Sequence, residues 1–471
     1  MPKRALSAVL DSGATSAASV IRRHLSPAVA NTSDFIAERA SGSYIYSTDG
    51  QKHLDMVASL GALSTGHCHP KVVNAIQKQA ASLIHSQQNI FAATTPLVGL
   101  LDRMMEITAP SLTRFFFANS GSEAVDNAIK IARGHTKRQN IICFENSFHG
   151  RTYGAMAVTT CKTYYRQGFA PLMPQVVVAP YPYCLHCKVR EAHPDGDSWY
   201  KVQPNGNPYE ARGCCNAPID ALKWILKQQS APSDTAAIII EPIMGEGGVL
   251  VPPPGFLPAL RQICNEHGIL LIIDEVQVGV GRTGEWWGHQ HVSGTAIEPD
   301  IMIFAKGIAS GFPFAGLATR EHLFEGLSPG TMGGTYGAGP LACATACATL
   351  DVIKEEKLLD NATARGRQLA SGLVELAERY PILDVRGRGL ICAAELGSRG
   401  GAASAEPGIA AAVTKAAGRR NLLLCTAGAR EVLRFLPPLT VSEGEIDKAL
   451  HILGESLEEV FNSSAAQLKV A

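Results

Sequence analysis

Residues 269–277 read ILLIIDEVQ, and this stretch decides the fold. The five residues before Asp274 are all apolar, which is typical of a strand that is covered on both faces of a sheet. Other short apolar runs repeat the pattern at 114–117, 140–144, 175–179, 236–240 and 301–304. Helical patterns lie between them at 122–133, 219–229 and 255–266. The alternation predicts an α/β protein whose central sheet is mainly parallel, with helices on both faces.

The order of these patterns also predicts the domain organisation. A chain of 471 residues can form two large domains or about three ordinary ones. After about residue 340, helices alternate with shorter strands at 390–395 and 432–435, which indicates a second, smaller α/β domain. We therefore expect a large ligand-binding domain over 66–336, a small C-terminal domain over 337–471, and an N-terminal segment, 1–65, that packs with the small domain.

The composition excludes several classes of protein. The chain is 46% hydrophobic and 18% charged, as in soluble globular proteins. Its 42 basic and 42 acidic residues balance, which argues against a nucleic-acid or membrane-surface binder. Twelve dispersed cysteines indicate a reducing compartment and a cytoplasmic protein. The alternative is a mitochondrial protein, because the first thirty residues contain four basic residues, one acid and many serines, as transit segments do.

Polar residues follow the predicted strands, and ligands of parallel sheets bind at the carboxyl ends of the strands. Gly121 and Ser122 open a helix, where free amides can hold an anion, although an ordinary helix cap has the same pattern. Asp274 closes an apolar strand and needs a cation or a donor there. Lys306 follows another apolar strand, either with its amine extended to water or as a desolvated amine suited to Schiff-base chemistry.

Together these residues supply a phosphate seat, a carboxylate and an amine, and Phe148 adds an aromatic ring at the same edge of the sheet. Pyridoxal phosphate needs this combination, because its aldehyde binds a lysine and its ring nitrogen pairs with an acid. The chain contains no G-x-G-x-x-G after a strand, no P-loop and no H-E-x-x-H. The sequence therefore favours a pyridoxal phosphate enzyme over a nucleotide-binding or zinc enzyme.

From about Ser43 to Ile446 the chain resembles the class III, or ω-amino acid, aminotransferases of fold type I. The motifs that carry the resemblance occur in order at 66–70, 119–124, 148–152, 241–248, 274–284, 304–307, 333–336 and 434–438. Within the family the chain is most similar to 4-aminobutyrate aminotransferases. The resemblance implies transfer of an ω-amino group to a 2-oxo acid, with 2-oxoglutarate as the expected acceptor. It also implies a homodimer or higher homo-oligomer.

The resemblance also assigns roles around the cofactor. Lys306 and Asp274 are the catalytic residues: Lys306 binds the aldehyde and moves a proton, and Asp274 pairs with the ring nitrogen. The other cofactor-binding residues are Phe148 and Val276 on the two ring faces, Gln277 at the phenolic oxygen, Gly121 and Ser122 at the phosphate, and Thr335, which comes from the partner subunit to the same phosphate.

Substrate recognition is implied in the same way. Arg434 is expected to bind the carboxylate beside the reacting carbon of the 2-oxo acid with parallel hydrogen bonds. Glu241 is expected to neutralise Arg434 when the ω-amine is bound. Arg151 is expected to hold the far carboxylate, and Leu60 to lie near the substrate.

Three alternatives remain open. The substrate can instead be that of an acetylornithine, ornithine, diamine or β-alanine:pyruvate aminotransferase. A non-catalytic protein that binds pyridoxal phosphate is a remote alternative, since such a protein has no need of Lys306 or Asp274. Four cysteines near an insert-like segment form a weak candidate metal site, with free thiols as the plainer interpretation: Cys184, Cys187, Cys214 and Cys215.

Overall fold

The computed structural model describes residues 23–30, 35–90, 93–186, 216–291, 297–398 and 407–462. Residues 1–22, most of the segment considered as a transit signal, lie outside the described residues. So do Cys187, Cys214 and Cys215. None of the described helices is long and apolar enough to cross a membrane.

A seven-stranded sheet forms the centre of the large domain, in the order β4-β10-β9-β8-β7-β5-β6. Its strands are β4 (Arg114–Ala118), β5 (Asn140–Phe144), β6 (Val176–Ala179), β7 (Thr235–Ile240), β8 (Leu270–Asp274), β9 (Ile301–Phe304) and β10 (Ala315–Thr319). Only β10 is antiparallel to its neighbours. The predicted mainly parallel sheet is confirmed, and β10 is an additional strand that the apolar pattern did not indicate.

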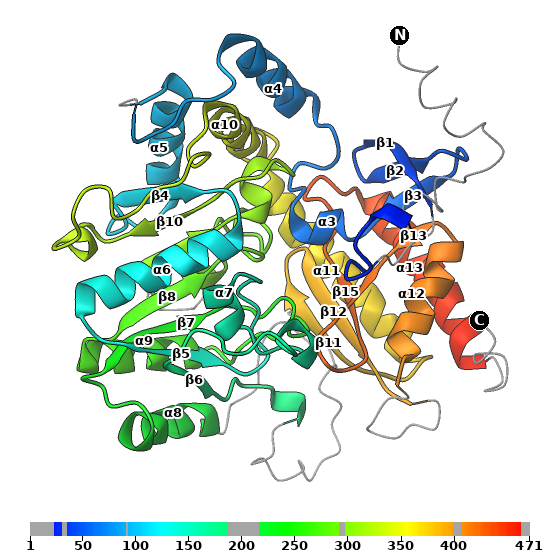
Figure 1. Cartoon of the computed structure of the whole chain (residues 1–471). Coiled ribbons are helices and arrows are strands. Elements are labelled where there is room, and N and C mark those ends of the chain that lie inside the picture. The colour runs from blue at the N-terminus through cyan, green and yellow to red at the C-terminus, as the bar shows by residue number, and fades with distance from the viewer. Residues whose placement is uncertain are drawn as a thin grey trace.

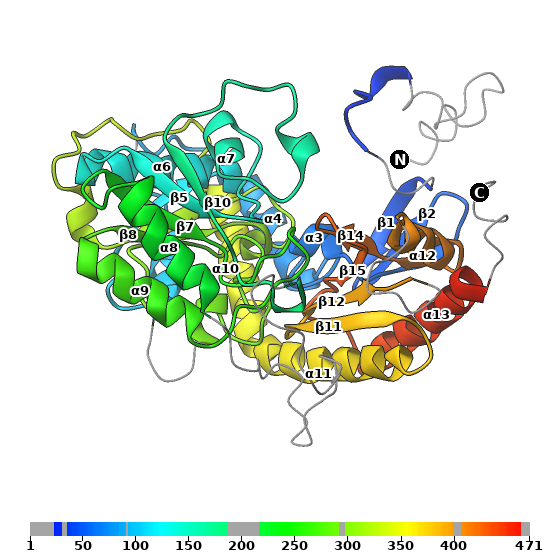
Figure 2. The ribbon, with the colours of Figure 1, turned by 90° about the horizontal axis from the view of Figure 1, so that it is seen from below.

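Helices cover both faces of this sheet. On one face lies α6 (Gly121–Thr136), which packs against β4, β7, β8, β9 and β10. On the other lie α8 (Ala217–Gln228), against β6, and α9 (Phe256–His267), against β8 (Figure 2). The two faces have separate apolar cores, one around Ile272 and one around Ile273, because neighbouring residues of a strand point to opposite faces.

The small domain is built on an antiparallel sheet in the order β11-β12-β15-β14. Its strands are β11 (Ile382–Arg388), β12 (Ile391–Leu396), β14 (Cys425–Ala427) and β15 (Val432–Phe435). Two helices pack against it, α11 (Leu358–Ala377) and α12 (Ile409–Arg419), and α13 (Glu443–Asn462) packs on these two helices. Figure 1 shows this unit beside the large sheet, with α3 (Ala58–Gly61) between the two.

The N-terminal segment joins the small domain through a second sheet. Strands β1 (Ala37–Ser41), β2 (Tyr44–Ser47) and β3 (Lys52–Asp55) form a meander, and β3 pairs in parallel with β13 (Leu422–Leu423). Helices α4 (Pro70–Ser82), α5 (Thr95–Ile107) and α10 (Pro340–Glu355) pack together, with α10 also against η4. α10 also packs against α11, so it lies between the large sheet and the small domain.

The remaining elements are short. They are α7 (Tyr153–Ala157), η1 (Thr163–Tyr165), η2 (Cys184–His186), η3 (Gly288–His291), η4 (Lys306–Ala309) and η5 (Glu321–Phe324).

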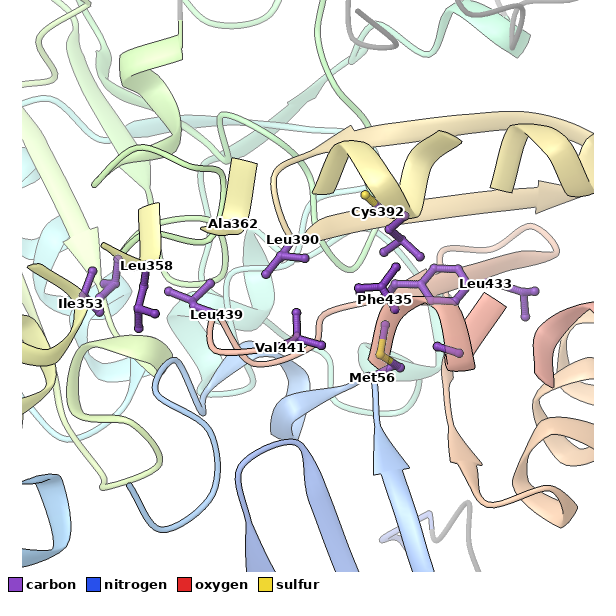
Figure 3. Packing of buried hydrophobic residues seen from close by; sticks show 14 of the residues in the cluster. Met56, Ile353, Leu358, Ala362, Leu390, Cys392, Leu433, Phe435, Leu439 and Val441 are labelled. Atoms are coloured by element: carbon purple, nitrogen blue, oxygen red, sulfur yellow. The ribbon is translucent and has the colours of Figure 1, made fainter. Parts of the chain in front are cut away.

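One apolar core connects the three parts of the chain. Figure 3 shows members of it from the N-terminal segment, α10 and β15, namely Met56, Ile353 and Phe435. Because side chains alternate along a strand, Leu433 and Phe435 point into this core, and Arg434 between them points to the other face, which borders the large domain. The alternation therefore places a buried arginine at the boundary between the two domains.

Candidate active site

Six of the seven strands run in one direction, so their carboxyl ends meet at one rim. The residues that the sequence singled out follow these ends: Gly121 after β4, Phe148 after β5, Glu241 after β7, Asp274 at the end of β8, and Lys306 after β9. The structure thus brings together the predicted seat, ring, carboxylate and amine.

Lys306 begins η4 with a φ of 42°, a left-handed backbone conformation that residues other than glycine rarely adopt. The residue is half-buried. Burial lowers the pKa of its amine, and Arg434 lowers it further, against the opposite influence of Asp274, Glu241 and Glu246. A lowered pKa makes the amine a better nucleophile near neutral pH.

Asp274 is held by two donors. Its Oδ2 lies 2.7 Å from Nδ1 of His149, and its Oδ1 accepts a hydrogen bond of 3.0 Å from the Val276 amide. Both side chains are buried, and within the described residues Nε2 of His149 has no partner. His149 was not among the predicted site residues, although it stands beside Phe148 in the same motif. The pair fixes the carboxylate in one orientation.

The first turn of α6 forms an anion seat. Ser120 caps the helix, and its side chain and that of Glu123 form a capping box. The amides of Gly121 and Ser122, at the first two helical positions, have no acceptor within the helix. Ser122 Oγ accepts a hydrogen bond of 3.1 Å from the Arg151 amide, and a Cβ on Gly150 would clash with it. The seat fits a phosphate group.

Gln277 joins Arg434 of the small domain to Leu60 of the N-terminal segment through two hydrogen bonds. Its Nε2 donates to the Leu60 carbonyl at 3.3 Å, and its Oε1 accepts from Nη1 of Arg434 at 3.3 Å. Leu60 is the third of four successive residues with positive φ in α3, and its side chain is exposed. Val276 packs close to Gly121, where a Cβ would lie 3.1 Å from its Cγ1.

Arg434 pairs with Glu246 rather than with Glu241, which corrects the expectation from the sequence. Its Nη1 lies 2.8 Å from Oε2 of Glu246. The Glu241 carboxylate is bound elsewhere, by the amides of Phe148 at 2.9 Å and Gly245 at 3.0 Å. The glycine-rich run 245–248 was visible in the sequence, but the turn that carries Glu246 to Arg434 was not.

Arg434 retains a free donor. Its side chain is almost completely buried, and Nε has no hydrogen-bond partner within the part of the chain that the structure describes. A buried, unpaired N–H is costly and suits a carboxylate that binds there.

Two other predicted site residues, Arg151 and Thr335, are exposed. Arg151 is exposed and lies over the ring of Tyr165, 4.5 Å from its centroid. Phe148 makes an edge contact with the same ring at 5.2 Å. Thr335 is exposed on the loop that precedes α10.

A metal site is not among the described features. Among the residues that the structure describes, no three His, Cys, Asp or Glu side chains are grouped to hold an ion. Of the four candidate cysteines only Cys184, in η2, is described.

The donor set fits pyridoxal phosphate. Four groups lie at one rim of the sheet. They are the free amides at the start of α6, the buried carboxylate of Asp274, the half-buried amine of Lys306, whose pKa is lowered, and the ring of Phe148. These groups define a pyridoxal-phosphate enzyme of fold type I.

Comparison with known proteins gives the family. The family described as Aminotransferase class-III matches residues 26–457, so the chain belongs to the class III aminotransferases and is a pyridoxal-phosphate-dependent transaminase. A probable 4-aminobutyrate aminotransferase of Bacillus subtilis is 34% identical, over 92% of this chain and 95% of that protein. A 5-aminovalerate aminotransferase of Pseudomonas aeruginosa is 35% identical, over 90% and 94%.

A solved structure shows the same fold. It is that of an (S)-enantioselective omega-transaminase from Thermomicrobium roseum, which is 30% identical. It superposes with a TM-score of 0.81 over 93% of this chain and 97% of that one.

Proposed function

We propose that this aminotransferase moves the ω-amino group of an amino acid such as 4-aminobutyrate to 2-oxoglutarate. The observation that carries the proposal is the buried Arg434, which is neutralised by a glutamate that can leave it, Glu246. The names of the two relatives, which act on 4-aminobutyrate and 5-aminovalerate, agree with it.

The two substrates differ at the reacting carbon. A 2-oxo acid has a carboxylate beside it, and an ω-amine does not. Arg434 must therefore be free for the first substrate and neutralised for the second, since an unpaired buried cation is costly. A movable Glu246 meets both needs. Arg151, exposed beside Phe148, would hold the distal carboxylate that both substrates share.

The remaining site residues have roles toward the cofactor. Bound pyridoxal phosphate supplies an aldehyde and a ring that accepts electrons. Lys306 would present its amine to the aldehyde and would afterwards carry the proton at Nζ. Asp274, oriented by His149, would keep a proton on the ring nitrogen, and Gly121 and Ser122 would hold the phosphate.

A donor screen with purified enzyme tests the proposal. 4-Aminobutyrate, 5-aminovalerate, β-alanine, ornithine, acetylornithine and a diamine are offered, each with 2-oxoglutarate or pyruvate. We expect the highest kcat/KM with a linear ω-amino acid and 2-oxoglutarate. Exclusive use of diamines or of pyruvate would refute the assignment.

Two variants test the glutamate–arginine pair. Glu246→Gln should impair the ω-amine half-reaction more than the glutamate half-reaction, because Arg434 loses its countercharge. Arg434→Met should do the reverse, with a loss of roughly 2–5 kcal/mol of binding for glutamate. Equal losses in both half-reactions would assign the pair to the fold.

We also propose that the enzyme is a homodimer with Thr335 at the interface. Ile84, Ile90 and Tyr336 are exposed apolar side chains, and the Tyr336 ring, next to Thr335, lies 5.3 Å from that of His85, next to Ile84. Large exposed apolar side chains on adjoining segments are typical of a protein–protein interface. Sedimentation should show a dimer, and Ile84→Asp should dissociate it and weaken cofactor binding. A monomer with full activity would contradict the proposal.

A further inference from the structure

Glu246 is held from two sides. Its Oε2 pairs with Arg434, and its Oε1 accepts a hydrogen bond of 3.0 Å from the Tyr165 hydroxyl and lies 3.6 Å from Nζ of Lys162. The side chains of Glu246 and Lys162 are only 14% and 17% exposed, and Tyr165 is buried. The carboxylate therefore bridges two cations within a largely dry site.

The two cations come from different domains. Arg434 lies on β15 of the small domain, whereas Lys162 and Tyr165 lie at η1 of the large domain. Two positive charges face one negative charge, so the group has one positive charge in excess. A substrate carboxylate on Arg434 would neutralise that excess. Without Lys162 the same carboxylate would leave Arg434 between two acids.

The backbone of Glu246 is fixed, so only its side chain is free to move. Its carbonyl accepts a hydrogen bond of 2.6 Å from the Gly428 amide. Two residues later, the Gly248 carbonyl accepts one of 2.9 Å from Nε of Arg386. The small domain thus holds the loop at the glutamate and two residues beyond it, and departure from Arg434 is a rotation of the side chain.

We propose that Lys162 and Tyr165 form a second anchor that retains Glu246 when a carboxylate occupies Arg434. They are positioning residues, and they determine whether the enzyme can accept substrates with a carboxylate beside the reacting carbon. This inference rests on the proposed use of both substrate types. The new element is the group that binds Glu246 after the substrate carboxylate has displaced it from Arg434.

The test uses the holoenzyme and its two half-reactions. One is run with an ω-amine, and the other with glutamate or alanine, either of which has a carboxylate beside the reacting carbon. Lys162→Met removes the charge and keeps the stem. We expect the KM for the α-amino acid to rise at least tenfold, and at least five times more than the KM for the ω-amine, with kcat little changed. Tyr165→Phe should give a smaller change in the same direction, and Lys162→Arg should restore the wild-type ratio.

A matched control is Lys71→Met, which removes a surface lysine paired with Glu355 and should change neither KM. Equal changes in both half-reactions, or none, for Lys162→Met and Tyr165→Phe would overturn the inference. A wild-type enzyme that reacts with no ω-amino acid would instead refute the proposed function. In that case the KM for the α-amino acid still decides the inference, because a rise in Lys162→Met that Lys162→Arg reverses supports the anchor and an unchanged KM overturns it.

Discussion

Glu241 should make the folded protein less stable as the pH rises from about 4.5 to about 7. Burial raises the pKa of this carboxyl from 4.5 to about 7, with Asp274 adding to the effect against the opposing influence of His149 and of the two amides that bind it. Between those pH values the folded state holds a proton that the unfolded state has lost. Unfolding then releases a proton, so the free energy of unfolding falls as the pH rises.

The size of the effect follows from the two pKa values. The interval from 4.5 to about 7, at about 1.4 kcal/mol for each pH unit, gives roughly 3 kcal/mol. Below pH 4.5 the free energy of unfolding contains the whole contribution of Glu241, and above about pH 7 this contribution is lost. Glu241→Gln cannot titrate, so its stability should lack this part of the pH dependence, whatever the substitution costs at a single pH.

Urea unfolding of the apoenzyme at pH 5 and pH 8, followed by tryptophan fluorescence, measures the difference. The wild type should lose about 2–3 kcal/mol more than Glu241→Gln between the two pH values. Glu145→Gln, which changes an exposed glutamate after the neighbouring strand β5, is the matched control and should behave as the wild type. Identical pH dependences for the wild type and Glu241→Gln would refute the reasoning.

Further predictions concern the cofactor site. Lys306→Ala should give a folded protein without transaminase turnover, and measurable steady-state activity would exclude the assigned role. Asp274→Asn should bind cofactor but slow proton abstraction in single turnovers, so unchanged rates would contradict its pairing with the ring nitrogen. Gly150→Ala should weaken cofactor binding roughly tenfold or more in a fluorescence titration, because its φ of 139° and the contact with Ser122 leave no room for a Cβ. Arg434→Met should raise the pKa of Lys306 and move the pH profile of cofactor uptake by the apoenzyme to higher pH; an unshifted profile would rule out that influence.

Much of the large domain could be predicted from the sequence, because its strands are buried on both faces and their apolar runs are unbroken. β10 was missed for the opposite reason. Its residues, AGLAT, are mostly small, and what makes it a strand is antiparallel pairing with β4 and β9 on its two sides. Those partners are about 200 residues and about a dozen residues away in sequence, so no local pattern indicates them.

The two glutamates show where sequence reasoning about the site ends. Glu241 and Glu246 follow the same strand, β7, and each is next to Pro or Gly. The backbone between Met244 and Leu250, which are joined by a β-bridge, forms a turn in which Glu246 reaches Arg434. Glu241 lies before this turn, and its carboxylate accepts hydrogen bonds from the Phe148 and Gly245 amides. The sequence motif indicated the loop 241–248, but only the geometry of the turn shows that Glu246 is the residue that pairs with Arg434. His149 was missed similarly, because its partner Asp274 is 125 residues away.

The pairing of β3 with β13 has a consequence for synthesis of the chain. Leu54 pairs with Leu422, so the N-terminal meander has an open edge until nearly the whole polypeptide has been made. At ~5–20 residues per second, that interval lasts roughly 20–70 s for the intervening residues. During it, β3 presents unpaired backbone groups to other nascent chains, and an open edge of this kind is a template for aggregation. A ribosome-bound fragment that ends before β13 should therefore need a chaperone more than the finished enzyme does, because β13, the last strand of this sheet to be made, covers the open edge of β3.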